Sequence, residues 1–353
     1  MRILYFSTVS WRWIKQRPQF IAEYLSLQDV EVDFLSLTPL GKGVVKKISK
    51  GKLNIIDTYV LPFSLKLRAI EMINVKYIQT LLNHREYDII ILTGPLQHQY
   101  IPECKKEKAV LVYECMDNMP FFYSGRLRER MIIEESITLN QVDAIITSSQ
   151  QLSLELKRRN QDCRLAITTI PNAVDENTFK RVPKKRALVE PNLVYIGTIS
   201  HWLDWETIIF FAKQYPDYSI YLIGPCEYKP EELPNNIIFA GVIPHEDVMD
   251  YIYSGDIMLL PFQVNELIRA VDPVKLYEYI GLNKRIISTY WTEIDKFDYN
   301  QLQFYSCYEE FEKAVLQYSE SNDHTGVNES FLNENSWIKR SSEYLSLLNR
   351  LLK

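Results

Sequence analysis

The chain has 353 residues, more than one typical core needs, which predicts about two domains. Apolar content of 46% and charged content of 24% are those of an ordinary soluble globular protein. No window holds the ~18 apolar residues of a membrane span, and the apolar run at the N-terminus is too short for a signal peptide. The five cysteines are scattered and lack metal-ligand spacing, so a reducing, cytoplasmic setting is expected.

Charge is distributed unevenly between the two halves of the sequence. Residues 1–190 hold 28 Lys and Arg against 21 Asp and Glu, whereas residues 191–353 hold 12 against 24. The first half is therefore basic and the second acidic, which indicates two domains with different partners. Because the total is acidic, at −5, and no basic stripe carries interleaved aromatics, a nucleic-acid partner is not expected.

In the first half, short apolar runs typical of buried strands alternate with segments of helical period. The predicted strands are 3–6, 30–34, 89–92, 110–113, 144–147 and 166–170. The predicted helices are 17–27, 68–84, 126–140 and 150–159. The charged, proline-punctuated stretch 181–191 follows and is interpreted as a linker.

The same alternation resumes after residue 191. Strands are predicted at 193–196, 218–223, 237–240, 257–260 and 285–288, with helices near 204–213 and 246–254 and a further helix in the segment 272–281. An amphipathic helix from 337 to 351 closes the chain. The expected organisation is an N-terminal acceptor-binding domain (1–180), the linker (181–191), a C-terminal donor-binding domain (192–335) and a last helix (336–353). Two doubly wound, Rossmann-like α/β domains would then bind ligands at the carboxyl ends of their strands, facing a central cleft.

The most informative segment is 272–281, with the sequence DPVKLYEYIG. Pro273 suits the first position of a helix, Asp272 can cap it, and the free N–H groups at a helix start favour an anion such as a pyrophosphate. Lys275 would add a positive charge, and Glu278 on the same face could accept hydrogen bonds from a ribose diol. The alternative is an ordinary capped helix with a solvated Lys275–Glu278 pair.

Several motifs in a fixed order give the chain a family resemblance. They are Trp13 with 16–19 (QRPQ), 112–118 (VYECMDN), 147–149 (TSS), 170–175 (IPNAVD) with Phe179, 195–199 (YIGTI) with Asp204, 222–225 (LIGP), Asp256 with 260–262 (LPF), and 272–281. In this order they resemble bacterial glycosyltransferases of the GT-B fold, of the family-four type and especially those of teichuronic acid and capsular polysaccharide biosynthesis. The resemblance spans nearly the whole chain, and the order of the motifs is more specific than any one of them.

The resemblance implies that the C-terminal domain binds a nucleotide-sugar, that the N-terminal domain binds an acceptor, and that the last helix crosses back onto the N-terminal domain. The donor-binding residues that follow are Lys275, Glu278, Arg269, Gly197, Gly224, Pro273 and Tyr277. The chain also departs from the family pattern, because the loop at Gly197 lacks the phosphate-binding cations of many members. Of the usual acidic pair only Glu278 remains. Because the Gly197 loop cannot supply the positive charge for the donor phosphates, Lys275 and Arg269 are the expected phosphate contacts.

Two residues are candidates for catalysis. Asp117 follows a buried strand where a loop should open toward the ligand, and a carboxylate there could act as the base that inversion requires. The alternative is a turn Asp that caps the segment before Pro120. His98 lies on the loop after the strand 89–92, where retaining members of the resembled family often place a His near the transferred sugar. The alternative for His98 is polar surface.

Trp13 and Arg17 are expected on the acceptor side. The Trp13 ring could stack on a sugar and Arg17 could hold an anionic group, but Trp13 could equally fill the domain core. The basic segment 42–68 contains seven cations and only Asp57 as an acid, so it could rest on anionic lipid or form a solvated loop and helix face. The seven are Lys42, Lys46, Lys47, Lys50, Lys52, Lys66 and Arg68.

The sequence therefore predicts a glycosyltransferase of the hexosyl-transferring type that moves a sugar from a nucleoside diphosphate sugar, most simply a UDP-sugar, to a cell-surface polysaccharide or a lipid-linked acceptor. It would need no cofactor, and without an Asp-x-Asp pair or a His/Cys cluster it would need no metal. It would work in the cytoplasm, in peripheral contact with the inner face of the membrane. The alternatives are a UDP-sugar epimerase on the same fold and a non-catalytic sugar-binding partner of a polysaccharide assembly complex.

Overall fold

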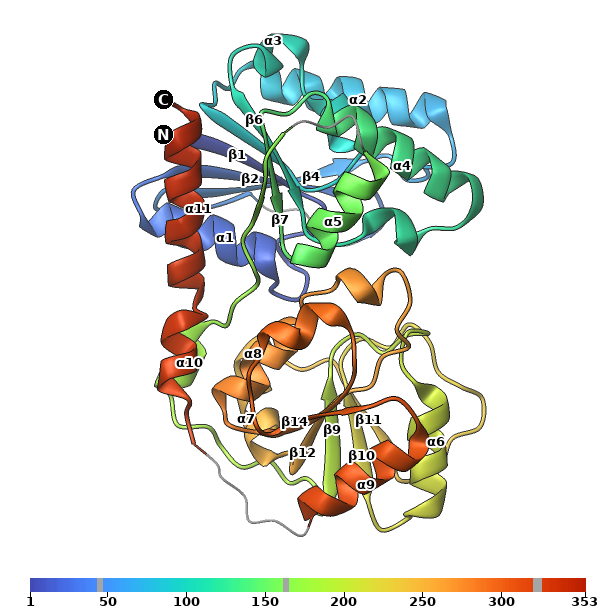
Figure 1. Cartoon of the computed structure of the whole chain (residues 1–353). Coiled ribbons are helices and arrows are strands. Elements are labelled where there is room, and N and C mark those ends of the chain that lie inside the picture. The colour runs from blue at the N-terminus through green and yellow to red at the C-terminus, as the bar shows by residue number, and fades with distance from the viewer. Residues whose placement is uncertain (43–46, 161–164, 320–325) are drawn as a thin grey trace. The chain divides into compact units, whose positions relative to one another are not determined.

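The computed structural model describes residues 1–42, 47–160, 165–319 and 326–353 (Figure 1). The chain divides into two compact units. Residues 1–172 and 337–353 form the first unit, and residues 173–336 form the second.

The first unit is built on one eight-stranded sheet with the order β3-β4-β2-β1-β5-β6-β7-β8. Every neighbouring pair is parallel except β3 and β4. The central strands are continuous apolar runs because helices cover both faces of such a sheet. Its strands are β1 (Arg2–Ser7), β2 (Glu31–Pro39), β3 (Lys47–Lys50), β4 (Leu53–Val60), β5 (Ile89–Leu92), β6 (Val110–Cys115), β7 (Ala144–Thr147) and β8 (Ile167–Thr169).

Helices follow most of these strands, as the sequence predicted. They are α1 (Arg17–Leu27), α2 (Arg68–Asn83), α3 (Glu103–Lys106), α4 (Gly125–Leu139), α5 (Gln150–Arg159) and α11 (Trp337–Leu351), with the short 3₁₀ turns η1 (Gln97–Tyr100) and η2 (Met119–Phe122). Helix α11 packs beside α1, where the rings of Phe20 and Trp337 stack with their centroids 5.1 Å apart. The predicted return of the last helix to the first unit is confirmed.

The second unit holds a six-stranded, all-parallel sheet with the order β11-β10-β9-β12-β13-β14. Its strands are β9 (Asn192–Ile196), β10 (Ser219–Ile223), β11 (Ile237–Gly241), β12 (Ile257–Leu260), β13 (Arg285–Thr289) and β14 (Leu302–Tyr305). Its helices are α6 (Trp205–Gln214), α7 (Val248–Ser254), α8 (Val274–Gly281), α9 (Tyr308–Ser319) and α10 (Glu329–Glu334). One continuous apolar core fills both sides of the sheet. The order steps in both directions from β9, as in doubly wound folds.

A buried ion pair lies at the centre of the first unit. The Arg17 Nε donates to the Glu114 carboxylate over 2.6 Å, and the hydroxyls of Tyr5 and Tyr344 donate to the same carboxylate. Burial is the largest single influence and lowers the pKa of Arg17, but the Glu114 charge, its hydrogen bond and the neighbouring Tyr5 and Tyr344 together raise the pKa above its usual value. Arg17 also donates to Asn172 Oδ1 over 3.2 Å, so the pair joins β1, α1, β6, α11 and the end of the unit.

The boundary of the first unit differs from the sequence-based prediction of residue 180. Residues 173–180 belong to the second unit because Val174 packs with Tyr277 and Leu332 there, and because its N–H donates to Asn335. The predicted linker is not a free tether. Arg181 and Arg186 both contact the buried Asp250 carboxylate, at 2.6 and 2.9 Å, which fixes the segment to the second unit.

The structure contains elements that the sequence analysis missed. Residues 47–60 form a hairpin of β3 and β4, although the sequence analysis predicted no strand in the segment 42–68 and considered it either a contact with anionic lipid or a solvated loop and helix face. Its alternation of lysines with apolar residues is that of an edge hairpin with one covered face. Strand β14 and helix α9 were also missed. Within the described residues, no helix is both long and apolar enough to span a bilayer.

Removing the Arg17 charge should destabilise the protein strongly. Arg17→Met leaves the fully buried Glu114 carboxylate without its cation, which costs about 3–5 kcal/mol. Arg158→Met, which removes one partner of the exposed Arg158–Glu155 pair, should cost at most about 1 kcal/mol. Urea denaturation followed by circular dichroism measures both. A loss below about 1 kcal/mol for Arg17→Met would show that the pair does not hold the unit together.

Candidate functional site

A pocket of about 550 Å³ opens at the carboxyl ends of β1, β2 and β4 in the first unit. Its lining residues come from the loop after β1 and from the ends of β2 and β4: Thr8, Val9, Ser10, Arg12, Trp13, Gln16, Leu37, Thr38, Pro39, Lys42 and Asp57. Trp13 is 53% exposed at this pocket, so it does not fill the core. The neighbouring Trp11 is half-buried instead, and its ring meets Phe34 edge to face. The carboxyl edge of the sheet is where parallel α/β folds bind ligands.

Asp57 gives this pocket a carboxylate that the sequence analysis did not single out. It is 2% exposed, and its Oδ1 accepts hydrogen bonds from Ser36 Oγ at 3.2 Å and Thr38 Oγ1 at 2.7 Å. A buried carboxylate held by two hydroxyls is suited to accept a further hydrogen bond from a bound sugar hydroxyl. The signal available in the sequence was a single acid inside an apolar strand.

Arg17 does not reach this pocket. Its side chain is 3% exposed and is committed to Glu114, Asn172 and the carbonyl of Pro171. The prediction that it holds an anionic acceptor group is therefore corrected, because no ligand can approach the guanidinium as it lies. Glu114 is a structural residue, since its carboxylate accepts from Arg17, Tyr5 and Tyr344.

Asp117 lies on a loop that is fixed on both sides. The Ser148 hydroxyl donates to the Met116 carbonyl over 2.6 Å, and Arg159 donates to Asn118 Oδ1 over 2.7 Å. The helical turn η2 begins after Asn118 without a side-chain cap, so Asp117 is not a capping residue. Burial raises the pKa of Asp117 to about 6, and the nearby charge of Arg17 opposes that rise. A carboxylate that titrates near neutral pH is suited to general base catalysis.

His98 is mostly buried and has a carboxylate partner. Its Nε2 lies 2.8 Å from Glu134 Oε2 on α4, and Glu134 also lies 3.6 Å from Arg130. The residue is therefore not free polar surface, which was the alternative interpretation. Its contacts tie the loop after β5 to α4.

In the second unit, the loops after β9 and β10 approach each other at two glycines. Gly224 has a φ of +140°, and a Cβ added there would lie 2.1 Å from the Gly197 carbonyl oxygen. A Cβ on Gly197 would lie 2.6 Å from the Tyr195 hydroxyl. Position 224 therefore requires glycine, whereas a side chain at 197 would have to displace the Tyr195 hydroxyl.

The segment 272–281 differs in detail from its prediction. Helix α8 begins at Val274, with Pro273 preceding it and without a side-chain cap. Asp272 does not cap the helix, because its carboxylate accepts from Tyr277 Oη at 3.0 Å and from Lys296 Nζ at 2.7 Å. Lys275 and Glu278 form an ion pair of 2.7 Å, with side chains 24% and 9% exposed.

The other predicted donor residues lie differently. Tyr277 is 1% exposed and supports the segment from inside, so a donor contact by its side chain is corrected to a packing role. Arg269 is exposed and lies 3.3 Å from Glu266. On the loops after β9 and β10 of the same sheet, the rings of His201 and Tyr228 stack with their centroids 3.7 Å apart, a contact that the sequence analysis did not foresee.

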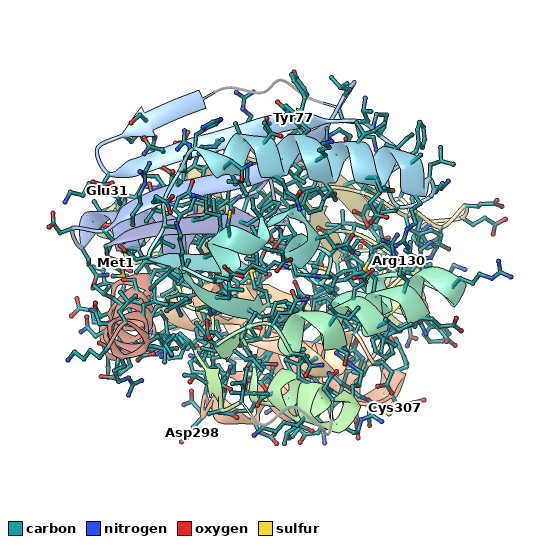
Figure 2. The ribbon with its side chains drawn as sticks, turned by 90° about the horizontal axis from the view of Figure 1, so that it is seen from above. Met1, Glu31, Tyr77, Arg130, Asp298 and Cys307 are labelled. Carbon is teal, nitrogen blue, oxygen red and sulfur yellow. The ribbon has the colours of Figure 1, made fainter. Side chains whose placement is uncertain are left out.

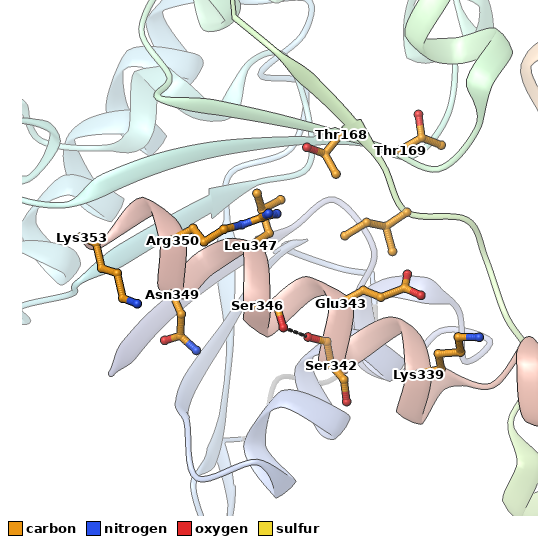
Figure 3. Close-up of a pocket in the computed structure, with 11 residues that line it drawn as sticks. Thr168, Thr169, Lys339, Ser342, Glu343, Ser346, Leu347, Asn349, Arg350 and Lys353 are labelled. Carbon is orange, nitrogen blue, oxygen red and sulfur yellow. Dashed lines mark hydrogen bonds between the residues drawn. The ribbon is translucent and has the colours of Figure 1, made fainter.

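A larger hollow of about 770 Å³ in the first unit lies between β8 and α11 (Figure 3). It gathers hydroxyls and basic side chains, including Thr168, Lys339 and Arg350, and its only carboxyl side chain is Glu343. None of the residues predicted for the site lines it. In the part of the chain that the structure describes, no group of three or more His, Cys, Asp or Glu side chains is arranged to hold a metal ion.

Two Rossmann-like units, with the last helix returned to the first, define the GT-B fold, and the chain has this fold as the sequence predicted. Solved structures over nearly the whole chain share it. Sucrose-phosphate synthase from Thermosynechococcus elongatus matches with a TM-score of 0.70 and 13% identity, covering 100% of this chain and 96% of that one. Anabaena Alr3699/HepE, in complex with UDP and glucose, matches with a TM-score of 0.65 and 12% identity, covering 98% and 99%.

One curated protein is similar in sequence. TuaH of Bacillus subtilis (strain 168), to which a role as a teichuronic acid biosynthesis glycosyltransferase is ascribed, is 27% identical over 199 residues. The alignment covers 51% of this chain, and the chain spans about half the length of that relative. No family model matches the sequence.

The raised pKa of Asp117 predicts a stability effect with a definite sign. An unfolded Asp titrates near 3.9, while Asp117 in the folded protein titrates at about 6, so the folded state binds the proton more tightly. Its carboxylate therefore costs stability above pH 6, and the cost disappears below about pH 4. Asp117→Asn should raise the free energy of unfolding by about 1–3 kcal/mol at pH 7.5 but hardly change it at pH 4. Urea denaturation at the two pH values measures this, and a less stable variant at pH 7.5 would refute it.

Proposed function

We propose that this protein is a glycosyltransferase that moves a sugar from a nucleoside diphosphate sugar, most simply a UDP-sugar, to a polysaccharide or lipid-linked acceptor. The observation that carries the proposal is Asp117, a carboxylate with a pKa of about 6 on a fixed loop at the carboxyl edge of the first sheet in a GT-B fold. The similarity to TuaH supports a cell-surface polysaccharide as the product.

The chemistry assigns separate tasks to the two units. In the first, Asp117 would accept the proton of the acceptor hydroxyl as the new glycosidic bond forms, which gives inversion at the anomeric carbon. The pocket with Trp13 and Asp57 would hold the acceptor by ring stacking and by hydrogen bonding to a sugar hydroxyl. His98, paired with Glu134, would position the loop after β5; if it contacts the transferred sugar instead, retention follows.

In the second unit, the bare backbone at Gly197 and Gly224 would accommodate the donor. Lys275 and the N–H groups at the start of α8 would stabilise the diphosphate leaving group, and Arg269 is an exposed cation for the same charge. Glu278 would accept hydrogen bonds from the ribose. Because Lys275 and Glu278 are bonded to each other, donor binding would replace that ion pair with two ligand contacts.

Asp117→Asn should abolish transfer without unfolding the protein. Loss of a general base costs about 10²–10⁴-fold in rate. The measurement is nucleoside diphosphate release from a panel of nucleotide-sugars in the presence of a glycan acceptor. Glu129→Gln, an exposed acid on α4, should retain wild-type activity as a control. His98→Ala tests the other candidate, and full activity in both Asp117→Asn and His98→Ala would remove the catalytic assignment.

Donor binding should weaken when the α8 contacts are removed. Each charge-assisted hydrogen bond contributes about 1.5–3 kcal/mol, so Lys275→Ala and Glu278→Ala should each weaken UDP binding at least about tenfold. Gly224→Ala should do the same, because its Cβ would collide with the Gly197 carbonyl. Titration calorimetry with UDP measures all three, with Lys213→Ala on the exposed face of α6 as the control. Unchanged binding in all three variants would place the donor elsewhere.

We also propose that the first unit contacts an anionic membrane, where a lipid-linked acceptor would be found. Within the predicted segment 42–68, Lys42, Lys66 and Arg68 lie beyond the carboxyl ends of β2 and β4, while Lys52 precedes β4 and pairs with Asp29. A strand of eight residues spans about 26 Å, so these cations do not form one cluster. Lys46 lies outside the described residues. The proposal of membrane contact therefore depends on Lys42, Lys66 and Arg68, beyond the carboxyl ends of β2 and β4.

A further inference from the structure

The outward face of α2 is apolar where a surface helix is normally polar. Residues Glu71, Asn74, Ile78 and Leu82 face the protein, while Met72, Ile73 and Tyr77 are exposed by 50% or more. The exposed three recur at the spacing that places them on one helix face, together with Lys76. Figure 2 labels Tyr77 on this helix.

The loop before α2 extends this apolar face. Phe63, Leu65 and Leu67 are exposed large side chains, with Phe63 at 65%. Phe63 has a φ of +68°, a conformation that a bulky side chain rarely adopts. The backbone N–H groups of Lys66 and Leu67 both donate to its carbonyl, so the turn is tight and holds the ring outward.

Loop and helix form one rigid surface. Asn74, buried under α2, accepts from the Leu61 N–H at 2.8 Å and donates to the Leu61 carbonyl at 2.9 Å. These two hydrogen bonds fix the start of the loop to the helix. We call this surface the apolar face; it consists of Phe63, Leu65, Leu67, Met72, Ile73 and Tyr77.

Its charges all have one sign. Lys66, Arg68 and Lys76 are exposed in the same segment as the apolar face, and the only acid between residues 58 and 85 is Glu71, which is buried and paired with Arg130. Exposed apolar side chains among unopposed cations suit a bilayer with anionic headgroups.

The apolar face lies next to the acceptor pocket. Val60, which ends β4 immediately before the loop, pairs in register with Pro39 and accepts from the Leu40 N–H at 2.9 Å. Pro39 and Lys42 line the pocket. A lipid-linked acceptor held in a bilayer at the apolar face would thus have its sugar near Trp13 and Asp57.

From these observations we propose that the apolar face inserts into the surface of an anionic bilayer and presents lipid-linked acceptors to the pocket at Trp13. Phe63, Leu67, Met72 and Ile73 enter the boundary between headgroups and acyl chains, Tyr77 lies at headgroup level, and the three cations meet lipid phosphates. This inference rests on the proposed function for its acceptor but not for its membrane binding, which is measured without any reaction.

The test is sedimentation of the full chain with phosphatidylcholine vesicles, with and without a quarter of phosphatidylglycerol. Binding is expected only with the anionic lipid and should weaken at high salt. Ile73→Glu should reduce the partition coefficient at least about tenfold, whereas Leu154→Glu, equally exposed on α5, should leave it unchanged. The triple variant Lys66→Glu/Arg68→Glu/Lys76→Glu should reduce it at least about a hundredfold, since each near-surface cation contributes about fivefold.

Two outcomes would overturn the inference. One is a failure of the vesicle assay: either the wild-type protein does not bind anionic vesicles, or the Ile73→Glu and Leu154→Glu variants bind them equally well. The other is that light scattering finds an oligomer that Ile73→Glu dissociates, which would make the apolar face a protein interface. Each variant's transfer rate with a water-soluble acceptor is measured in parallel. A variant that loses vesicle binding but keeps transfer supports membrane binding by the apolar face and leaves the proposed function standing. If the wild-type protein binds vesicles but transfers no sugar, the proposed function fails while the membrane inference stands.

Discussion

The buried pair of Arg17 and Glu114 is the interaction on which the rest of the first unit depends. It joins the first strand, the first helix, the strand that leads to Asp117, and the helix that ends the chain. Because Arg17 also holds Asn172, it fixes the point at which the chain leaves the unit. The same guanidinium charge opposes the rise in the pKa of Asp117. One buried cation therefore both stabilises the core and adjusts the ionisation of the candidate base.

The proposed catalytic surface at Asp117 and the proposed donor surface in the second unit differ in the interactions that form them. Around Asp117, hydrogen bonds from Ser148 and Arg159 fix the loop, so the carboxylate is held in a partly desolvated position that costs stability. In the second unit the proposed donor surface consists of backbone, because Gly197 and Gly224 carry no side chains. Lys275 and Glu278 neutralise each other there until a ligand separates them. Such costs are typical of functional sites, where local strain and uncompensated charge serve binding or catalysis.

The sequence predicted most strands and helices, because long apolar runs and helical periodicity arise directly from burial. It predicted the return of the last helix through its family resemblance. It could not predict that Arg17 is buried while Trp13 is exposed, because both lie near the start of one helix and the partners that bury Arg17 are 97 to 155 positions away. The hairpin of β3 and β4 was missed because lysines interrupt its apolar residues, so the segment was considered only as a lipid contact or a solvated face. Asp272 was wrongly expected to cap a helix, because its partner Lys296 lies 24 residues further on.

The central claim is glycosyl transfer, and product analysis tests it most directly. The protein would be incubated with a UDP-sugar and a glycan acceptor, and the products would be quantified by mass spectrometry. The account predicts one elongated acceptor for each UDP released, with both products absent when the acceptor is omitted or when Asp117 is replaced by Asn. A new UDP-sugar or a free monosaccharide formed without an acceptor would contradict transfer and indicate an epimerase or a hydrolase.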